Sequence, residues 1–124
     1  MSYYASQGYA YGHPGIDYAL PIGTPVLAMA DGEVTHSGTD PEFPGRGIHV
    51  WIDHGDYCTV YMHLERCDVQ EGQQVRRRER IGFSGYSGLV DPPGPAGAHL
   101  HVGLESDAGD PAMRGFIDPA PLLV

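Results

Sequence analysis

Two histidines that could share one chemical task, His99 and His101, stand one residue apart near the end of the chain. In a β-strand successive side chains face opposite sides of the sheet. Leu100, Val102 and Leu104 would then face the core, and both histidines would face a cleft. Two imidazoles about 6.5 to 7 Å apart on a rigid strand can serve as a metal ligand and an acid–base group. A plain solvent-facing pair is the alternative.

A second polar pair, His13 and Asp17, brackets a Pro-Gly dipeptide. Pro-Gly favours a tight turn, which could bring an imidazole and a carboxylate together. These donor types suit Zn²⁺, and a third ligand from the strand of paired histidines would leave one position open, as in catalytic zinc sites. The chain has no His-Glu-x-x-His helix, so a zinc hydrolase would belong to a β-type class.

A third candidate, His63, lies in a segment that alternates apolar and polar side chains. Alternation predicts a core face that carries Cys58, Val60, Met62 and Leu64, and an opposite face that carries Tyr57, Thr59, Tyr61 and His63. His63 would then look away from the core. It could join His99 beside a metal-bound water, or it could be an ordinary edge histidine.

The remaining histidines carry smaller expectations. We expect a structural hydrogen-bonding role for His54, which stands between Asp53 and Gly55. His36 and His49 have no evident partner in the sequence. Because His49 alternates with Trp51 and Asp53, it is expected to be a half-exposed strand residue.

The elements that must position these residues are short strands separated by glycine-containing turns from Pro25 onward, which predicts an all-β fold. Asp31-Gly32 predicts a two-residue hairpin between residues 25–30 and 33–37. Residues 47–53 and 57–64 are predicted to be adjacent antiparallel strands. Further strands are expected at residues 69–75, 80–84 and 99–105, with a Gly/Pro-rich loop at 85–98 and a coil over the C-terminal residues 106–124.

Size and charge restrict the classes of protein. The 124 residues suit one domain, residues 1–124, with a catalytic core of about residues 12–105. The formal charge of −9 argues against a nucleic-acid partner. The sequence shows neither a membrane span nor a signal peptide, and a monomer is expected. Cys58 and Cys67 are too few for a disulfide scaffold, although one disulfide between them is possible.

Four sequence blocks, in this order and spacing, resemble a known family. They are His13-Pro-Gly-Ile-Asp17, the stretch from Pro21 to Val34, Ile52-Asp-His-Gly55 leading to Tyr61-Met-His-Leu64, and His99-Leu-His101. Over residues 12–105 the chain resembles the lysostaphin/LytM-type zinc endopeptidases, which cut peptide cross-links of bacterial peptidoglycan. Two positions depart from the family pattern: Arg78 replaces a usual turn glycine, and Ala98 replaces a common proline.

The resemblance implies one zinc ion bound by His13, Asp17 and His101, with His63 and His99 as the catalytic histidines. It also implies an antiparallel β-sheet domain with a groove, of the duplicated hybrid motif type. Zinc would lower the pKa of its bound water toward about 7. His99 would act as general base, and His63 would stabilise the oxyanion or protonate the leaving amine, although the two roles are interchangeable.

The expected function is therefore zinc-dependent endopeptidase hydrolysis of peptidoglycan cross-links, in the cell wall outside the cytoplasm or in the periplasm. Without a signal peptide, a phage lysin or virion-associated lysin is one possible context. The alternatives are a non-catalytic member of the same fold, which binds peptidoglycan or activates another hydrolase, and a structural phage component.

Overall fold

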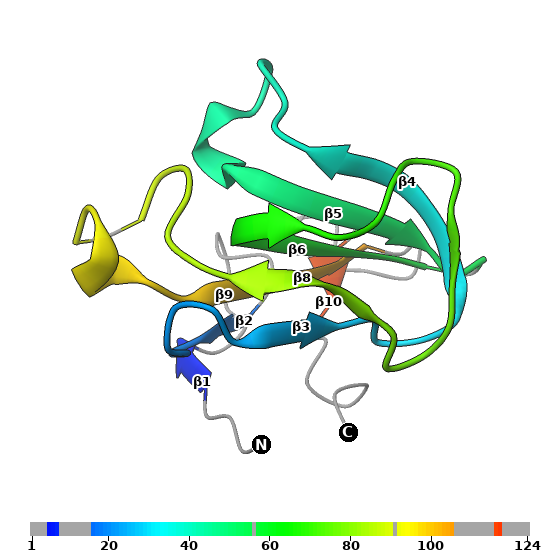
Figure 1. Ribbon diagram of the computed structural model, residues 1–124, viewed down its shortest axis with the longest axis horizontal. Helices are drawn as coiled ribbons and strands as arrows, with labels where there is room; N and C mark the ends of the chain where they lie inside the picture. The colour runs from blue at the N-terminus through cyan, green and yellow to red at the C-terminus, as the bar shows by residue number, and fades with distance from the viewer. Residues whose placement is uncertain (1–4, 8–15, 56, 91, 106–115, 118–124) are drawn as a thin grey trace.

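The computed structural model describes residues 5–7, 16–55, 57–90, 92–105 and 116–117 (Figure 1). Over these residues the chain forms short strands and two 3₁₀ turns, η1 (Pro44–Arg46) and η2 (Pro95–Gly97). The strands are β1 (Ala5–Gln7), β2 (Ile16–Tyr18), β3 (Pro25–Leu27), β4 (Gly32–Gly38), β5 (Ile48–Asp53), β6 (Cys58–Cys67), β7 (Gln74–Val75), β8 (Arg80–Ser84), β9 (Leu100–Glu105) and β10 (Phe116–Ile117). The predicted all-β class is confirmed.

All the strand pairs are antiparallel and belong to one sheet, in the order β1-β2-β9-β6-β5-β4-β7. β10 adds to β9, while β3 pairs with β8, which pairs with β6. The sheet branches at β6 because its first half pairs with β9 and its second half with β8. This branching lets the sheet curl on itself, so that β3 and β8 lie across from β4 and β5 (Figure 1).

The core lies inside this curl and is rich in β-branched residues, which suit the pleated surface of a sheet. Val34, Val50, Ile52, Leu64 and Ile81 are fully buried there. A smaller cluster on the other side contains Val60 with Trp51 and Met62 packed against it. The predicted pairing of residues 47–53 with residues 57–64 is confirmed by the β5–β6 ladder.

The hairpin predicted at Asp31-Gly32 is wrong, because β3 pairs with β8 whereas β4 pairs with β5 and β7. A two-residue hairpin turn needs positive φ angles, and Gly32 does not have one. Instead, the Asp31 carboxylate accepts the backbone N–H of Arg77 at 2.7 Å. Glycine is needed at position 32 for space, since a Cβ there would lie 2.5 Å from the carbonyl oxygen of Asp53.

The predicted faces of β6 are also wrong in part. Tyr61 belongs to the main core cluster, and Val60 belongs to the smaller one. The Tyr61 hydroxyl accepts the backbone N–H of Met29 at 2.9 Å and is hydrogen-bonded to the Thr59 hydroxyl at 2.8 Å. These bonds satisfy the polar end of a buried tyrosine, so this side chain can replace an aliphatic residue in the core.

The structural role predicted for His54 is confirmed. Its Nδ1 is hydrogen-bonded to the Asp31 carbonyl oxygen at 2.7 Å, and its Nε2 to the Thr59 hydroxyl at 2.8 Å. His54 therefore joins the turn after β3 to the polar pair on β6. The Asp31–Gly32 segment is thus held by side-chain hydrogen bonds rather than by a hairpin.

Three smaller expectations have different outcomes. The strand expected at 69–75 is reduced to β7, and the C-terminal segment expected as coil contributes β10, which pairs with β9. Cys58 and Cys67, the first and last residues of β6, are both thiols, so the possible disulfide is absent. Among the described residues no helix has the length and apolar character needed to cross a membrane.

Candidate metal centre and active site

His63 stands at the point where β6 changes partners. Cys58–Met62 pair with β9, and the pairing with β8 begins at Leu64. His63 itself has φ of 64°, a left-handed conformation that is uncommon for a residue with a Cβ. Such an irregularity breaks the alternation of the strand and re-aims the side chain. This is why Tyr61 and Leu64, three residues apart, both enter the main core.

The irregularity gathers three histidines at one place. The centroid of the His63 ring lies 4.6 Å from that of His99 and 6.5 Å from that of His101. His63 and His101 are buried, with 7% and 8% exposure, and His99 is half-buried. The histidines of the His-x-His motif thus lie next to His63, although His63 does not point simply away from the core as the sequence predicts.

Backbone carbonyl groups orient two of these rings. The Nδ1 of His63 lies 2.8 Å from the carbonyl oxygen of Ser87, and the Nδ1 of His99 lies 2.8 Å from that of Gly97. A carbonyl oxygen can only accept, so each Nδ1 carries the hydrogen and the lone pair of the neutral ring lies on Nε2. Both imidazoles are therefore held in the tautomer that can take up a proton at Nε2.

Ser87 positions His63 and was not found from the sequence. Its hydroxyl donates to the Leu64 carbonyl oxygen at 2.6 Å and accepts the backbone N–H of Ile48 at 2.9 Å. A serine within a Gly/Pro-rich loop gives no signal of this kind, because the contact depends on how the loop folds back over β5 and β6. Ser87 thus ties the loop behind His63 to two strands.

The backbone around Ser87 packs so closely against the backbone around Gly47 that glycine is required at two positions. At Gly47, where φ is +64°, a Cβ would lie 2.4 Å from the Ser87 carbonyl carbon. At Gly88, where φ is +78°, a Cβ would lie 2.4 Å from the Gly47 nitrogen. Both positions need the left-handed backbone and the missing side chain that only glycine supplies. The two backbones therefore pack directly against each other beside the histidines.

The residues predicted to bind metal are only partly described. His101 on β9 is the direct register partner of Asp17 on β2. Directly paired Cα atoms of antiparallel strands lie about 4.5 to 5.5 Å apart. His13 lies outside the described residues. Imidazole nitrogen and carboxylate oxygen form a donor set that suits Zn²⁺. The placement of Asp17 opposite the buried His101 therefore fits the metal that the family resemblance implies.

Comparison with known proteins agrees with this geometry. Residues 11–112 match the model of peptidase family M23. The chain is 44% identical over 93 residues to the peptidoglycan DD-endopeptidase ShyA of Vibrio cholerae, a match that covers 74% of this chain and 20% of that protein. The chain therefore spans about a fifth of the length of the curated relatives that it matches first.

Two solved structures have the same fold. One is the catalytic domain of lysostaphin from Staphylococcus simulans, with a TM-score of 0.76 and 28% identity over 97% of this chain and 89% of that one. The other is a zinc-containing peptidase from Vibrio cholerae, with a TM-score of 0.73 and 30% identity over 82% of this chain and 33% of that one. The chain therefore belongs to peptidase family M23, the lysostaphin/LytM-type zinc metallo-endopeptidases.

Proposed function

We propose that this domain uses zinc to hydrolyse peptide cross-links of bacterial peptidoglycan. The observation that carries the proposal is the cluster of His63, His99 and His101, whose rings come from two strands and meet at a backbone irregularity. Unusual backbone conformations at non-glycine residues are concentrated at active sites, where the surrounding structure maintains them. The names of relatives, among them peptidoglycan endopeptidases, supply the substrate class.

His13, Asp17 and His101 would hold the metal. Support comes from the register that pairs Asp17 with His101 and from the burial of His101. Three protein ligands leave one position for water or substrate, as in catalytic zinc sites. Zinc in such a site supplies Lewis-acid polarisation of the scissile carbonyl group and a lowered pKa for the attacking water.

His99 and His63 would move the protons. His99 accepts a proton at Nε2 because its Nδ1–H is bonded to the Gly97 carbonyl group. His63, held in the same way by Ser87, would donate from a protonated Nε2 to the developing oxyanion or to the leaving amine. The ring centroids lie 4.6 Å apart, so both imidazoles can reach the same scissile peptide group.

The substrate would be the peptide of the cell wall, and the site of action would be extracellular or periplasmic. This proposal rests on relatives such as ShyA and ShyC of Vibrio cholerae, which are named peptidoglycan DD-endopeptidases. We further propose that residues 1–124 act as one peptidase domain and as a monomer, with no nucleic-acid partner. The net charge of −9 supports the last point, since a nucleic-acid surface needs positive charge.

Alanine substitutions at His99 and His101 test the division of roles. His101→Ala should lose bound zinc and activity together. His99→Ala should keep its zinc and its thermal stability, yet lose hydrolysis by about a hundredfold or more, because only proton transfer is removed. His63→Ala should behave like His99→Ala. Zinc content, thermal unfolding and release of peptides from purified sacculi are measured on each variant beside the parent.

Two results would overturn the proposal. The first is a parent protein that binds sacculi without releasing peptides, which would favour a non-catalytic member of the fold. The second is full hydrolysis in the presence of a strong chelator, because a zinc-dependent site must lose activity when the metal is removed and regain it when zinc is returned.

A further inference from the structure

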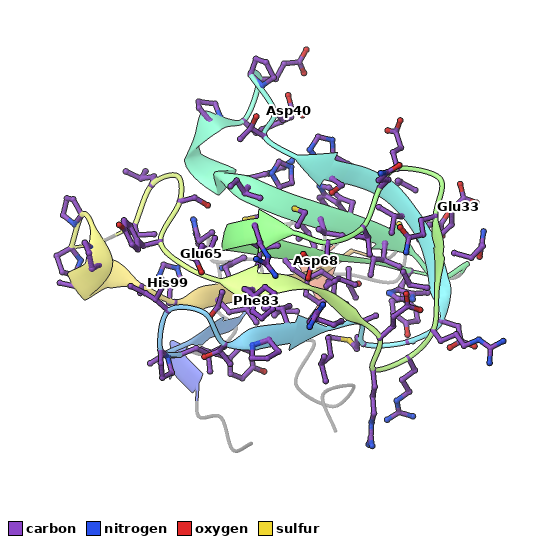
Figure 2. The ribbon with its side chains drawn as sticks, viewed as in Figure 1. Glu33, Asp40, Glu65, Asp68, Phe83 and His99 are labelled. Carbon is purple, nitrogen blue, oxygen red and sulfur yellow. The ribbon has the colours of Figure 1, made fainter. Side chains whose placement is uncertain are left out.

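A second group of metal-binding side chains lies away from the three clustered histidines. His36 on β4, Asp40 in the β4–β5 connection and His49 on β5 each offer a donor atom, and these atoms lie within 4.8 Å of one another. Figure 2 shows Asp40 at the top of the molecule, on the β4–β5 connection, and His99 beside the start of β9. None of the three residues is among His13, Asp17 and His101, the proposed ligands of the catalytic zinc.

His49 is the unusual member of this group. The sequence predicts a half-exposed strand residue, which is wrong, because His49 is 0% exposed. Register shifts at residues 48–50 of β5 and 34–36 of β4 break the alternation on which that prediction relied. Its Nδ1 lies 3.0 Å from the Gly47 carbonyl oxygen, whereas its Nε2 is buried with no hydrogen-bond partner among the described residues. A buried polar atom without a partner destabilises the folded state, because it has lost its hydrogen bonds to water.

The tautomers follow from these contacts. The Gly47 carbonyl group can only accept, so Nδ1 of His49 carries the hydrogen and Nε2 carries a lone pair. The Nε2 of His36 lies 3.2 Å from the Gly38 carbonyl oxygen, which by the same reasoning leaves the lone pair on its Nδ1. Metal-binding histidines typically donate their other N–H to a carbonyl group in this way, which fixes the ring and the coordinating nitrogen.

Asp40 adds an anionic donor beside the two rings. One of its carboxylate oxygens accepts the backbone N–H of Glu42 at 2.9 Å, which orients the side chain. A carboxylate has about four acceptor positions, so this single bond leaves capacity for a cation. The His36 and His49 rings are stacked, with centroids 4.4 Å apart and an angle of 23°. The stacking places the two rings side by side, next to the Asp40 carboxylate.

The electrostatic surroundings favour neutral, coordinating imidazole at position 49. Burial lowers the pKa of His49 below its ordinary value because desolvation penalises the charged ring, and His36 and Arg46 lower it further. The Gly47 carbonyl group and Asp40 act in the opposite direction. Arg46 is the cation that opposes a bound metal here, and its guanidinium group lies over the Phe43 ring, 3.9 Å from the centroid.

We propose that His36, Asp40 and His49 form a second, structural binding site for a divalent transition metal of the zinc type. Two imidazole nitrogens and a carboxylate oxygen are ligands that Zn²⁺ favours, and a fourth position is left for water. The metal would give the buried Nε2 of His49 the partner that no described residue supplies.

Such a metal would restrict the conformation of the β4–β5 connection. It would join the end of β4 to the start of β5 across residues 39–47, the segment that ends at Gly47. The Gly47 backbone carries the carbonyl group that holds His49 and packs against Ser87, whose own carbonyl group holds His63. The second site would thus stabilise the strand end on which the Ser87 contact rests.

Metal content of chelator-treated protein tests the proposal. The full chain is dialysed free of metal, equilibrated with zinc and assayed for bound zinc by elemental analysis. We expect about two equivalents for the parent and about one for Asp40→Asn, His36→Gln or His101→Ala. Asp40→Asn keeps an oxygen for the Glu42 N–H, so the metal-free variant should unfold at the same temperature as the parent. Glu42→Gln is the matched control and should still bind about two equivalents.

The background of His101→Ala separates the two sites. Zinc should raise the unfolding temperature of His101→Ala but not of the double variant His101→Ala/Asp40→Asn, which should bind no zinc. One equivalent in the parent, lost in His101→Ala, would overturn the second site and leave the proposed peptidase intact. Undiminished zinc content in both Asp40→Asn and His36→Gln would also overturn it.

Discussion

Replacing Gly47 with alanine should damage hydrolysis from outside the histidine cluster. Gly47 has φ of +64°, and a Cβ there would lie 2.4 Å from the Ser87 carbonyl carbon and 2.5 Å from its oxygen. Contacts below 3.4 Å are already tight for a Cβ, so the Ser87 backbone must move by about 1 Å. That carbonyl oxygen is the one that holds Nδ1 of His63 at 2.8 Å.

The size of the effect follows from two separate costs. A left-handed backbone costs an L-residue about 1 to 2 kcal/mol, which lowers the free energy of unfolding. Misplacing a catalytic group by about 1 Å costs about a hundredfold in rate, equivalent to about 2.7 kcal/mol of transition-state stabilisation. Gly47→Ala should therefore lose about a hundredfold in kcat/KM while losing only part of its stability.

Gly72→Ala is the matched control. Gly72 also has a positive φ, +89°, but a Cβ there would meet nothing within 4 Å. Gly72→Ala should therefore lose about 1 to 2 kcal/mol of unfolding free energy but hydrolyse peptidoglycan at the parent rate. Thermal unfolding of both variants is measured first. Peptide release from sacculi is then measured at a temperature where each variant is fully folded. If Gly47→Ala hydrolyses as fast as Gly72→Ala, the argument that Ser87 positions His63 is wrong.

Two further predictions concern stability. Burial raises the pKa of Tyr61 from 10.0 to about 12, so the folded state favours the protonated phenol. The stabilisation is complete below pH 10 and is lost as the pH rises through about 12, by up to about 3 kcal/mol. Urea unfolding from pH 8 to 12 should show this loss in the parent and not in Tyr61→Phe; equal pH slopes would contradict it. Arg78 has φ of 70°, so Arg78→Gly should raise the free energy of unfolding by up to about 1 kcal/mol. Arg77→Gly, at a residue without positive φ, should lower the free energy of unfolding. Thermal unfolding of the two variants would show whether their effects have opposite signs.

The sequence predicted the strands whose alternation is regular. In β9, Leu100 and Val102 enter the core as expected, and the pairing of β5 with β6 follows from two neighbouring β-rich segments. Alternation fails in β6 because His63 adopts a left-handed conformation at the position where the strand changes partners. The conformational propensity of histidine does not predict this kink, because the kink is imposed by the pairing of β6 with two separate strands.

Non-local contacts account for the other differences. Asp31-Gly32 has the composition of a hairpin turn, but the backbone N–H of Arg77 and the ring of His54 hold Asp31 in another arrangement. Burial of His49 depends on register shifts in both β4 and β5. A prediction from strict alternation of side chains between the two faces of a strand cannot take such shifts into account. The resemblance to a family pointed to His63, His99 and His101, and the structure brings these three together.

The two cysteines stand at opposite ends of β6. Nine residue steps along a strand span up to about 30 Å, whereas the Cα atoms of a disulfide lie within about 7 Å. Oxidation can therefore link these thiols only between two copies of the chain or to another thiol. Oxidising surroundings therefore add no cross-link within the sheet of one chain, and a covalent change at these thiols takes the form of a bond to another molecule.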